Sequence, residues 1–165
     1  MKRIYSVLVE NRSGVLCKVA GLFSRRCFNI DSLAVGETDD HAVSCMTIVS
    51  SGDERTLEQI EKQLAKLEDV IDIKKLQDGE SVCRELILVK IKINDTQRQA
   101  VLSVANIFRA KIVDVSNDSM VIELTGGQSK LDAFLDLLRG YDILELARTG
   151  ITGLSRGSSD VTIID

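Results

Sequence analysis

The residues best suited to bind a small ligand form a short polar loop, Asn11–Gly14, between an apolar run and a segment with helical spacing. The first turn of a helix leaves backbone N–H groups unpaired, and their partial positive charge suits a carboxylate. Gly14 has no side chain, so a ligand can come close to that backbone. The amide of Asn11 donates and accepts, so it can contact either the carboxylate or the ammonium group of an amino acid. The loop therefore predicts half of a binding site.

A second wall is required, because one open loop binds too weakly. A carboxylate at a helix N-terminus gains about 0.3 to 1 kcal/mol when exposed and about 2 kcal/mol when partly buried. Enclosing an aliphatic side chain adds about 1.5 to 3 kcal/mol. Asn29 and Ile30, which follow the helical segment, can supply a polar amide and an apolar contact. We expect them to come from a second copy of the chain, because a two-fold interface would give two identical shared pockets.

The elements around the loop follow a βαββαβ order. Apolar residues from Leu16 to Cys27 recur at helical spacing, and those between Leu57 and Leu67 recur at spacings of three and four. The strand-like runs are β-branched or alternate with polar residues. The expected elements are a strand at 4–9, a helix at about 14–26, strands at 30–37 and 42–50, a helix opening at 51–53, and a strand around 71–73.

The same order recurs in the second half of the chain with a different sequence. The expected elements are a strand at 86–93, a helix through 101–108 capped by Asp95 or Thr96, strands at 112–115 and 120–124, a helix after Gly126–Gly127, and a strand at 142–147. We therefore predict an α+β protein with two ferredoxin-like sandwiches in tandem. The predicted parts are a first domain at 1–76, a linker at 77–84, a second domain at 85–148, and a mobile tail at 149–165.

The second repeat lacks the features that make the first a binding site. Aligning Asn94 with Asn11 places Gln97 at the position of Gly14, and Lys111 falls near the position of Asn29. Both differences disfavour the binding of the same ligand in the second repeat. The second domain is expected to serve dimerisation or contact with another subunit.

Composition limits the other classes of function. The 165 residues carry a net charge of -4 with dispersed basic side chains, which argues against a nucleic-acid backbone as partner. Aromatic residues make up only 4%, and the run Ser44–Ile48 has none, so an RNA-recognition module is not expected. No apolar run reaches the roughly 18 residues of a membrane helix, and no signal-peptide core follows Met1. A soluble, cytoplasmic protein is expected.

Few residues suit catalysis or metal binding. The four cysteines have no metal-ligand spacing, so most are expected to be small core residues in a reducing compartment. His41 is expected in a hairpin turn. The acidic pairs Asp39–Asp40 and Glu68–Asp69 are interpreted as solvated charge, and Gly126–Gly127 lacks the Lys-Ser/Thr continuation of a phosphate loop. Neither catalysis nor a metal site is predicted for this chain.

Longer stretches resemble a known family. "LVENRSGVLCKVAGLFSRRCFNIDSLAVGETDD", "MTIVSSGDE" and "LEQIEKQLAKLEDVIDIKKL" closely resemble the small regulatory subunit of acetolactate synthase, also called acetohydroxyacid synthase. The resemblance continues through "RELILVKI", "VIELTGG" and "ELARTGI". The loop alone would indicate only an ACT domain, a ferredoxin-like module that binds amino acids. A stand-alone ACT protein that senses amino acids for another partner is the alternative.

The resemblance implies a function that residue spacing alone does not show. Such subunits are not catalysts; they bind the large subunit, raise its activity, and confer feedback inhibition by branched-chain amino acids, chiefly valine. Thiamine diphosphate, Mg²⁺ and FAD are expected on the large subunit, with none on this chain. The resemblance implies a homodimer through the ACT domains. It places the effector between Asn11, Gly14, Val15 and Leu16 of one subunit and Asn29 with Ile30 of the other.

Overall fold

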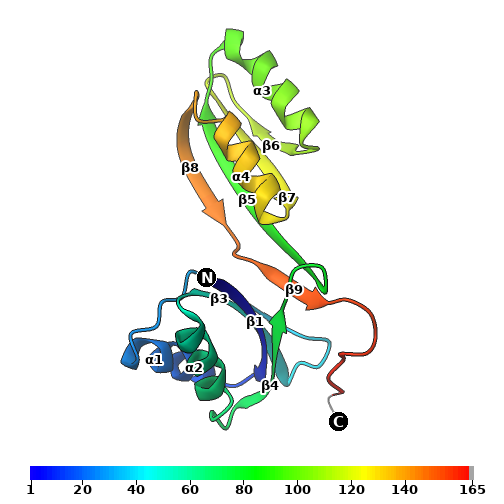
Figure 1. The fold of residues 1–165 in the computed structure, drawn as a ribbon. Coiled ribbons are helices and arrows are strands. Elements are labelled where there is room, and N and C mark those ends of the chain that lie inside the picture. The colour runs from blue at the N-terminus through cyan, green and yellow to red at the C-terminus, as the bar shows by residue number, and fades with distance from the viewer. Residues whose placement is uncertain (164–165) are drawn as a thin grey trace. The chain divides into compact units, whose positions relative to one another are not determined.

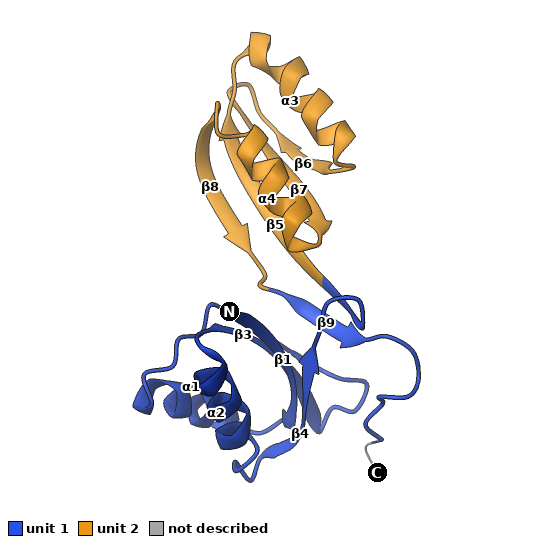
Figure 2. Ribbon diagram, in the orientation of Figure 1, with its two compact units in different colours: residues 1–83, 151–165 blue, residues 84–150 orange. Residues whose placement is uncertain are grey.

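The computed structural model describes residues 1–163, in two compact units (Figures 1 and 2). The first unit contains residues 1–83 together with the C-terminal segment from Ile151 onward, and the second contains Arg84–Gly150. Each unit has its own hydrophobic core. The chain therefore forms two sandwiches, and the C-terminal segment belongs to the first of them.

The first unit is a four-stranded sheet with two helices on one face (Figure 1). Its strand order is β2-β3-β1-β4, and each neighbouring pair is antiparallel. This is the ferredoxin-like arrangement that the βαββαβ pattern predicts. The elements are β1 (Lys2–Glu10), α1 (Val15–Arg25), β2 (Ser32–Glu37), β3 (Val43–Ser51), α2 (Glu54–Leu64) and β4 (Val70–Leu76).

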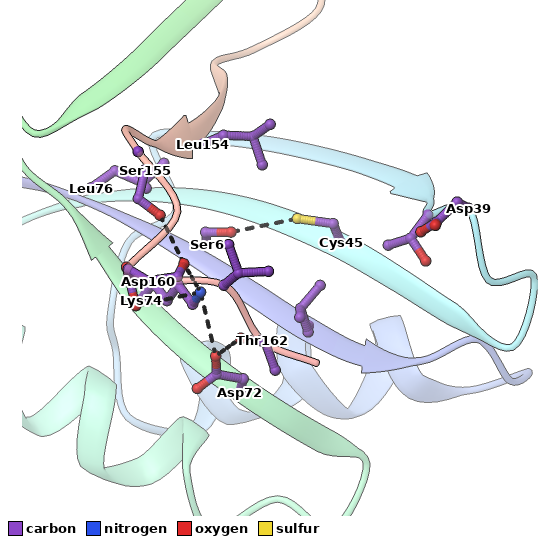
Figure 3. A pocket seen from close by; sticks show the side chains of 14 residues that line it. Ser6, Asp39, Cys45, Asp72, Lys74, Leu76, Leu154, Ser155, Asp160 and Thr162 are labelled. Carbon is purple, nitrogen blue, oxygen red and sulfur yellow. Dashed lines mark hydrogen bonds and ion pairs between the residues drawn. The ribbon is translucent and has the colours of Figure 1, made fainter. Parts of the chain in front are cut away.

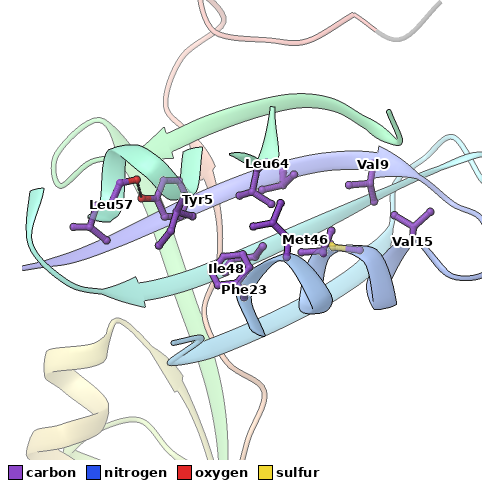
Figure 4. Close-up of a cluster of buried hydrophobic side chains, with 12 residues drawn as sticks. Tyr5, Val9, Val15, Phe23, Met46, Ile48, Leu57 and Leu64 are labelled. Atoms are coloured by element: carbon purple, nitrogen blue, oxygen red, sulfur yellow. Dashed lines mark hydrogen bonds between the residues drawn. The ribbon is translucent and has the colours of Figure 1, made fainter. Parts of the chain in front are cut away.

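The core of this unit lies between the helices and the sheet (Figure 4). Alternate residues of β1, beginning with Tyr5, point into it, as the period of two in a strand requires. Tyr5 is completely buried, and its hydroxyl donates to the carbonyl of Leu57 at 2.7 Å. From α1, Val15 and Phe23 reach the same core. Burying each such side chain contributes about 1.5 to 3 kcal/mol, which holds the start of α1 against the sheet.

The second unit repeats this architecture with strand order β6-β7-β5-β8. Its elements are β5 (Ser81–Lys92), of which residues 81–83 belong to the first unit, α3 (Asp95–Ile107), β6 (Lys111–Val115), β7 (Ser119–Gly126), α4 (Gln128–Leu137) and β8 (Asp142–Arg148). The predicted fold class is therefore confirmed for both halves. The strand predicted at 86–93 begins earlier, at Ser81, because the polar stretch before it also pairs in the sheet.

The predicted cap of α3 is wrong by one or two residues. Asn94, and neither Asp95 nor Thr96, is the N-cap. Its Oδ1 accepts from the backbone N–H of Gln97 at 2.9 Å, and the Gln97 Oε1 accepts from the Asn94 N–H at 3.1 Å. This reciprocal capping box satisfies two backbone donors, which favours Asn94 over its neighbours.

The C-terminal segment differs from the mobile tail predicted from residue 149. Thr152–Ser155 form strand β9, which pairs with β5. Gly153 fits tightly there: a Cβ at this position would lie 2.7 Å from Cys83 Sγ and 3.0 Å from the Val82 carbonyl oxygen. Further along, Lys74 Nζ lies 3.4 Å from Asp160 Oδ1, beside a cavity of about 500 Å³ on the first sheet (Figure 3). Thr152–Ser155 are therefore part of a sheet, whereas residues 164–165 of the predicted tail lie outside the described residues.

The cysteines are not core residues, contrary to the prediction. Cys17 and Cys27 are exposed, whereas Cys45 and Cys83 are partly buried, and all are free thiols. Cys17 lies on α1 outside the face that carries Val15 and Val19, so it points away from the sheet. Cys27 has a positive φ of 56° just past the helix end, which removes it from the helical period.

Two other expectations concern the surface. His41 lies in the turn between β2 and β3, as predicted, and its Nδ1 is 3.0 Å from Glu37 Oε2. Within residues 1–163, no helix is both long enough and apolar enough to cross a membrane.

Candidate functional site

Gly14 is the N-cap of α1 and leaves the helix start open. Its φ of 89° lies in the left-handed region, where glycine is favoured. No side chain caps this end of the helix, and a Cβ built on Gly14 would meet nothing within 4 Å. Unpaired N–H groups at a helix N-terminus attract anions. The geometry thus leaves space beside donors that suit a carboxylate.

Asn11 lies three residues before Gly14 and has an amide oxygen that can accept a hydrogen bond. Its Nδ2 donates to Glu37 Oε1 at 3.1 Å and to the His41 carbonyl at 2.9 Å. Both partners are acceptor oxygens, so the amide nitrogen must face them, and this fixes the orientation of the amide. Among residues 1–163, none donates to Asn11 Oδ1. Asn11 therefore suits an ammonium group better than a carboxylate.

Val15 and Leu16 differ in what they offer a ligand. Val15 is only 3% exposed and packs in the core, so its side chain anchors the helix and only its backbone faces the open end. Leu16 is 44% exposed, so its apolar side chain is accessible at the start of the helix. Leu16 can cover an aliphatic side chain, whereas Val15 positions the turn.

Asn29 and Ile30 lie beyond the other end of α1. Asn29 is exposed; its Nδ2 donates to Asp31 Oδ1 at 2.5 Å, and its carbonyl accepts from Ser50 Oγ at 2.6 Å. Ile30 is half-buried against the core of the first unit. An eleven-residue helix, about 16 Å long, separates these residues from the loop of the same chain. One chain does not bring the two groups together around a ligand as small as an amino acid.

Asp69 is a buried carboxylate beside the loop that the sequence prediction missed. The prediction of solvated charge is wrong for this residue: its side chain is only 4% exposed. Oδ1 accepts from Arg12 Nη2 at 2.7 Å, and Oδ2 accepts from Lys18 Nζ at 2.6 Å. These hydrogen bonds, first from Lys18 and then from Arg12, hold the pKa of the Asp69 carboxyl below its usual 3.8. The predicted topology could have indicated this burial, because the start of β4 lies beside the end of antiparallel β1.

The pH dependence of folding should report this lowered pKa. A carboxyl whose pKa falls on folding adds stability above its unfolded pKa, and the addition is lost as pH falls through the folded value. The Asp69→Asn variant should therefore be less stable than the wild type at neutral pH. The gap should close as pH drops below 3.8. Urea unfolding between pH 7 and pH 3 measures both free energies, and a gap that does not change with pH would contradict the assignment.

The corresponding position in the second unit is already occupied by the chain itself. Asn94 and Gln97 cap α3 reciprocally, whereas Gly14 leaves the start of α1 uncapped. A ligand carboxylate at α3 would have to displace two side-chain hydrogen bonds. Of the first helices of the two units, only α1 starts without a side-chain cap, although α4 in the second unit also starts at a glycine, Gly127, without one. In neither unit do the described residues include a group of three or more His, Cys, Asp or Glu that could hold a metal ion.

Comparison with known proteins finds a matching family model for each half of the chain. A family model described as the AHAS small subunit-like ACT domain matches residues 5–72, and one described as the small subunit of acetolactate synthase matches residues 84–157. A probable acetolactate synthase small subunit of Methanothermobacter thermautotrophicus is 51% identical over 156 residues, covering 94% of this chain and 93% of that protein. The chain belongs to the acetolactate synthase small-subunit family.

Other members of the small-subunit family are similar to this chain over nearly its whole length. The isozyme 3 small subunit of Escherichia coli is 51% identical over 158 residues, covering 95% of this chain and 97% of that protein. The crystal structure of the acetolactate synthase small subunit from Thermotoga maritima superposes with a TM-score of 0.87 at 41% identity, covering 96% and 99% of the two chains. The resemblance found in the sequence is therefore confirmed, and it includes both units.

Proposed function

We propose that this chain is the regulatory subunit of acetolactate synthase, which binds the large catalytic subunit, raises its activity, and makes it respond to valine. Membership of the small-subunit family supports the partner. The observation that carries the effector site is the uncapped start of α1 at Gly14, together with the acceptor oxygen of Asn11. Thiamine diphosphate, Mg²⁺ and FAD are assigned to the large subunit.

Each part of the amino acid has a matching group in this proposal. The carboxylate lies against the backbone N–H groups that follow Gly14, and the ammonium group donates to Asn11 Oδ1. The exposed side chain of Leu16 covers one side of the aliphatic group. Asn29 and Ile30 of a second copy cover the other side, which makes valine a bridge between two chains.

Strand β2 supports this two-chain arrangement. It is the edge strand of its sheet, and Val35 in it is 47% exposed. If two copies pair antiparallel through β2, the beginning of one β2 lies opposite the end of the other. Asn29 and Ile30 precede β2, whereas Asn11 binds Glu37 at its end. Pairing of this kind would bring both walls together, twice, in a homodimer.

Regulation then follows from a difference in affinity between two arrangements. A ligand that bound both arrangements equally would shift nothing, so valine must favour the one that lowers large-subunit activity. A coupling of about 1 to 3 kcal/mol is typical of such effects. Because the pocket is shared, valine acts directly on how the two first units pair.

The second unit is proposed to bind no valine and to serve dimerisation or contact with the large subunit. The Asn94→Ala variant should cost about 1 kcal/mol of stability, because it removes a helix cap. The half-inhibitory valine concentration should stay unchanged. Thermal unfolding measures the first effect, and a valine titration of the reconstituted enzyme measures the second. A marked change in valine response would contradict the assignment of the site to the first unit.

Reconstitution with the large subunit tests the proposed function as a whole. Acetolactate formation is followed with the large subunit alone, after addition of this chain, and during a titration with valine. We expect activity to rise on addition of the chain and then to fall with valine. If the chain bound valine in calorimetry but left the large subunit unaffected, the stand-alone amino-acid sensor would be the correct interpretation.

A further inference from the structure

We infer that Asp69 is a positioning residue for the effector site: it ties the Asn11–Gly14 loop and the first turn of α1 to the sheet in the geometry that receives the ligand. This inference rests on the proposed function. Asp69 lies between α2 and β4 and makes no approach to the ligand itself in this scheme. It acts through the backbone that carries the helix N–H groups.

Three contacts converge on Asp69 from the two sides of the loop. Its backbone carbonyl accepts from the N–H of Glu10, the last residue of β1, at 2.9 Å. One carboxylate oxygen accepts from Arg12 within the loop at 2.7 Å. The other accepts from Lys18 on α1, which lies just after the open helix start, at 2.6 Å. The segment before Gly14 and the segment after it are thus tied to one buried carboxylate.

Side-chain packing at the tip of the loop is too sparse to replace the hydrogen bonds made by Asp69. Nothing lies within 4 Å of a Cβ built on Gly14, and both Asn11 and Arg12 are exposed. On one side the loop is held by Asn11, whose Nδ2 donates to Glu37 and the His41 carbonyl and whose backbone N–H donates to the Ala42 carbonyl at 2.7 Å. On the other side it is held by Asp69. Side chains cannot pack inside a site that must stay open for a ligand. The shape of such a site therefore depends on hydrogen bonds made by the residues around it.

The solvent exposure of its two cationic partners makes Asp69 suitable for mutation. The side chains of Arg12 and Lys18 are 64% and 59% exposed, so both cations stay solvated when the carboxylate is removed. Removing a cation instead weakens the pairing of a buried charge, which is more costly. Asp69→Asn keeps the shape and removes the charge, and it should loosen the loop without leaving an unpaired buried ion.

The test compares valine responses in the reconstituted enzyme. With Asp69→Asn, we expect the half-inhibitory valine concentration to rise about tenfold or more, the scale of one lost charge-assisted hydrogen bond. Activation of the large subunit at zero valine should be unchanged. The matched control is Glu68→Gln, which makes the same charge change at the neighbouring exposed residue and should leave the response at the wild-type value.

A second variant separates positioning from general stability. Lys18→Gln removes one tie and should raise the half-inhibitory concentration several-fold in the wild-type background. In the Asp69→Asn background the same change should have little further effect, because the tie is already broken. Because the two residues are in contact, non-additivity shows only that they act through one contact. If that contact only stabilised the fold, urea unfolding would show a loss of stability while the half-inhibitory valine concentration stayed at the wild-type value. Lys18→Gln leaves the Asp69 carboxylate paired with Arg12, so it remains a test if Asp69→Asn does not fold.

The outcomes distinguish this inference from the proposed function. If the wild-type enzyme responds to valine and both Asp69→Asn and Lys18→Gln respond like it, the positioning role is overturned while the proposed function stands. If the wild-type enzyme does not respond to valine at all, the proposed function fails. Calorimetry of valine binding to the isolated small subunit should show the same ranking of variants as the enzyme assay.

Discussion

Replacing Gly14 with aspartate is expected to leave the reconstituted enzyme active and to abolish its response to valine. The space beside Gly14 is open, so the new side chain would enter the region proposed for the ligand. Its carboxylate would face the carboxylate of valine, and like charges brought together cost several kcal/mol. We expect the half-inhibitory valine concentration to rise at least about a hundredfold. Acetolactate formation at increasing valine concentration measures this directly.

The Gly14→Asn variant separates charge from shape. Asparagine is nearly the same size as aspartate and tolerates the left-handed backbone at this position, where φ is 89°. It should weaken the response to valine much less than aspartate does, because it adds no charge. Equal effects of the two variants would indicate a purely steric block. Normal inhibition of the Gly14→Asp enzyme would refute the site.

Mixing two valine-insensitive variants is expected to restore part of the valine response. Gly14→Asp damages the loop wall, and Asn29→His damages the opposite wall. In a mixed dimer, one pocket combines both damaged walls, while the other combines the intact loop of the Asn29→His chain with the intact Asn29 of the Gly14→Asp chain. Random association makes about half of the dimers mixed, each with one intact pocket.

Co-expression of the two variants with the large subunit provides this test. Each variant alone should be insensitive to valine, and the co-expressed pair should show partial inhibition at concentrations close to those of the wild type. A matched control co-expresses Gly14→Asp with Gly14→Asp/Asn29→His, in which every pocket contains the damaged loop wall. No recovery in the first pair would mean that the pocket lies within one chain, contrary to the distance that α1 imposes between the two walls.

Local sequence pattern was sufficient for the elements of both units. Strand and helix periods depend on which face of each segment is apolar, and this can be read from neighbours a few residues apart. The run before Asn11 and the spacing after Gly14 therefore predicted β1, the loop and α1. The open helix start also followed from local residue types, because glycine leaves space wherever the backbone turns. The family resemblance was specific because it extended over long stretches of both halves.

Contacts between distant segments could not be predicted in this way. The burial of Asp69 depends on β4 lying beside β1 and on cations from Arg12 and Lys18, more than 50 residues away in the chain. Composition indicated a flexible C-terminal segment, yet Thr152–Ser155 pair with β5. Sequence patterns also missed the exposure of Cys17 and Cys27, which depends on which side of α1 meets the sheet.

The sequence by itself determined the order of the elements, the ferredoxin-like class of both units, and the residue types of the loop, because each depends on local periodicity and local backbone preference. Tertiary structure alone decided which charges are buried and where the C-terminal segment packs. The burial of a charge and the pairing of two strands depend on segments that meet only after folding. The free energies of these contacts therefore cannot be read from residues that are neighbours in the sequence.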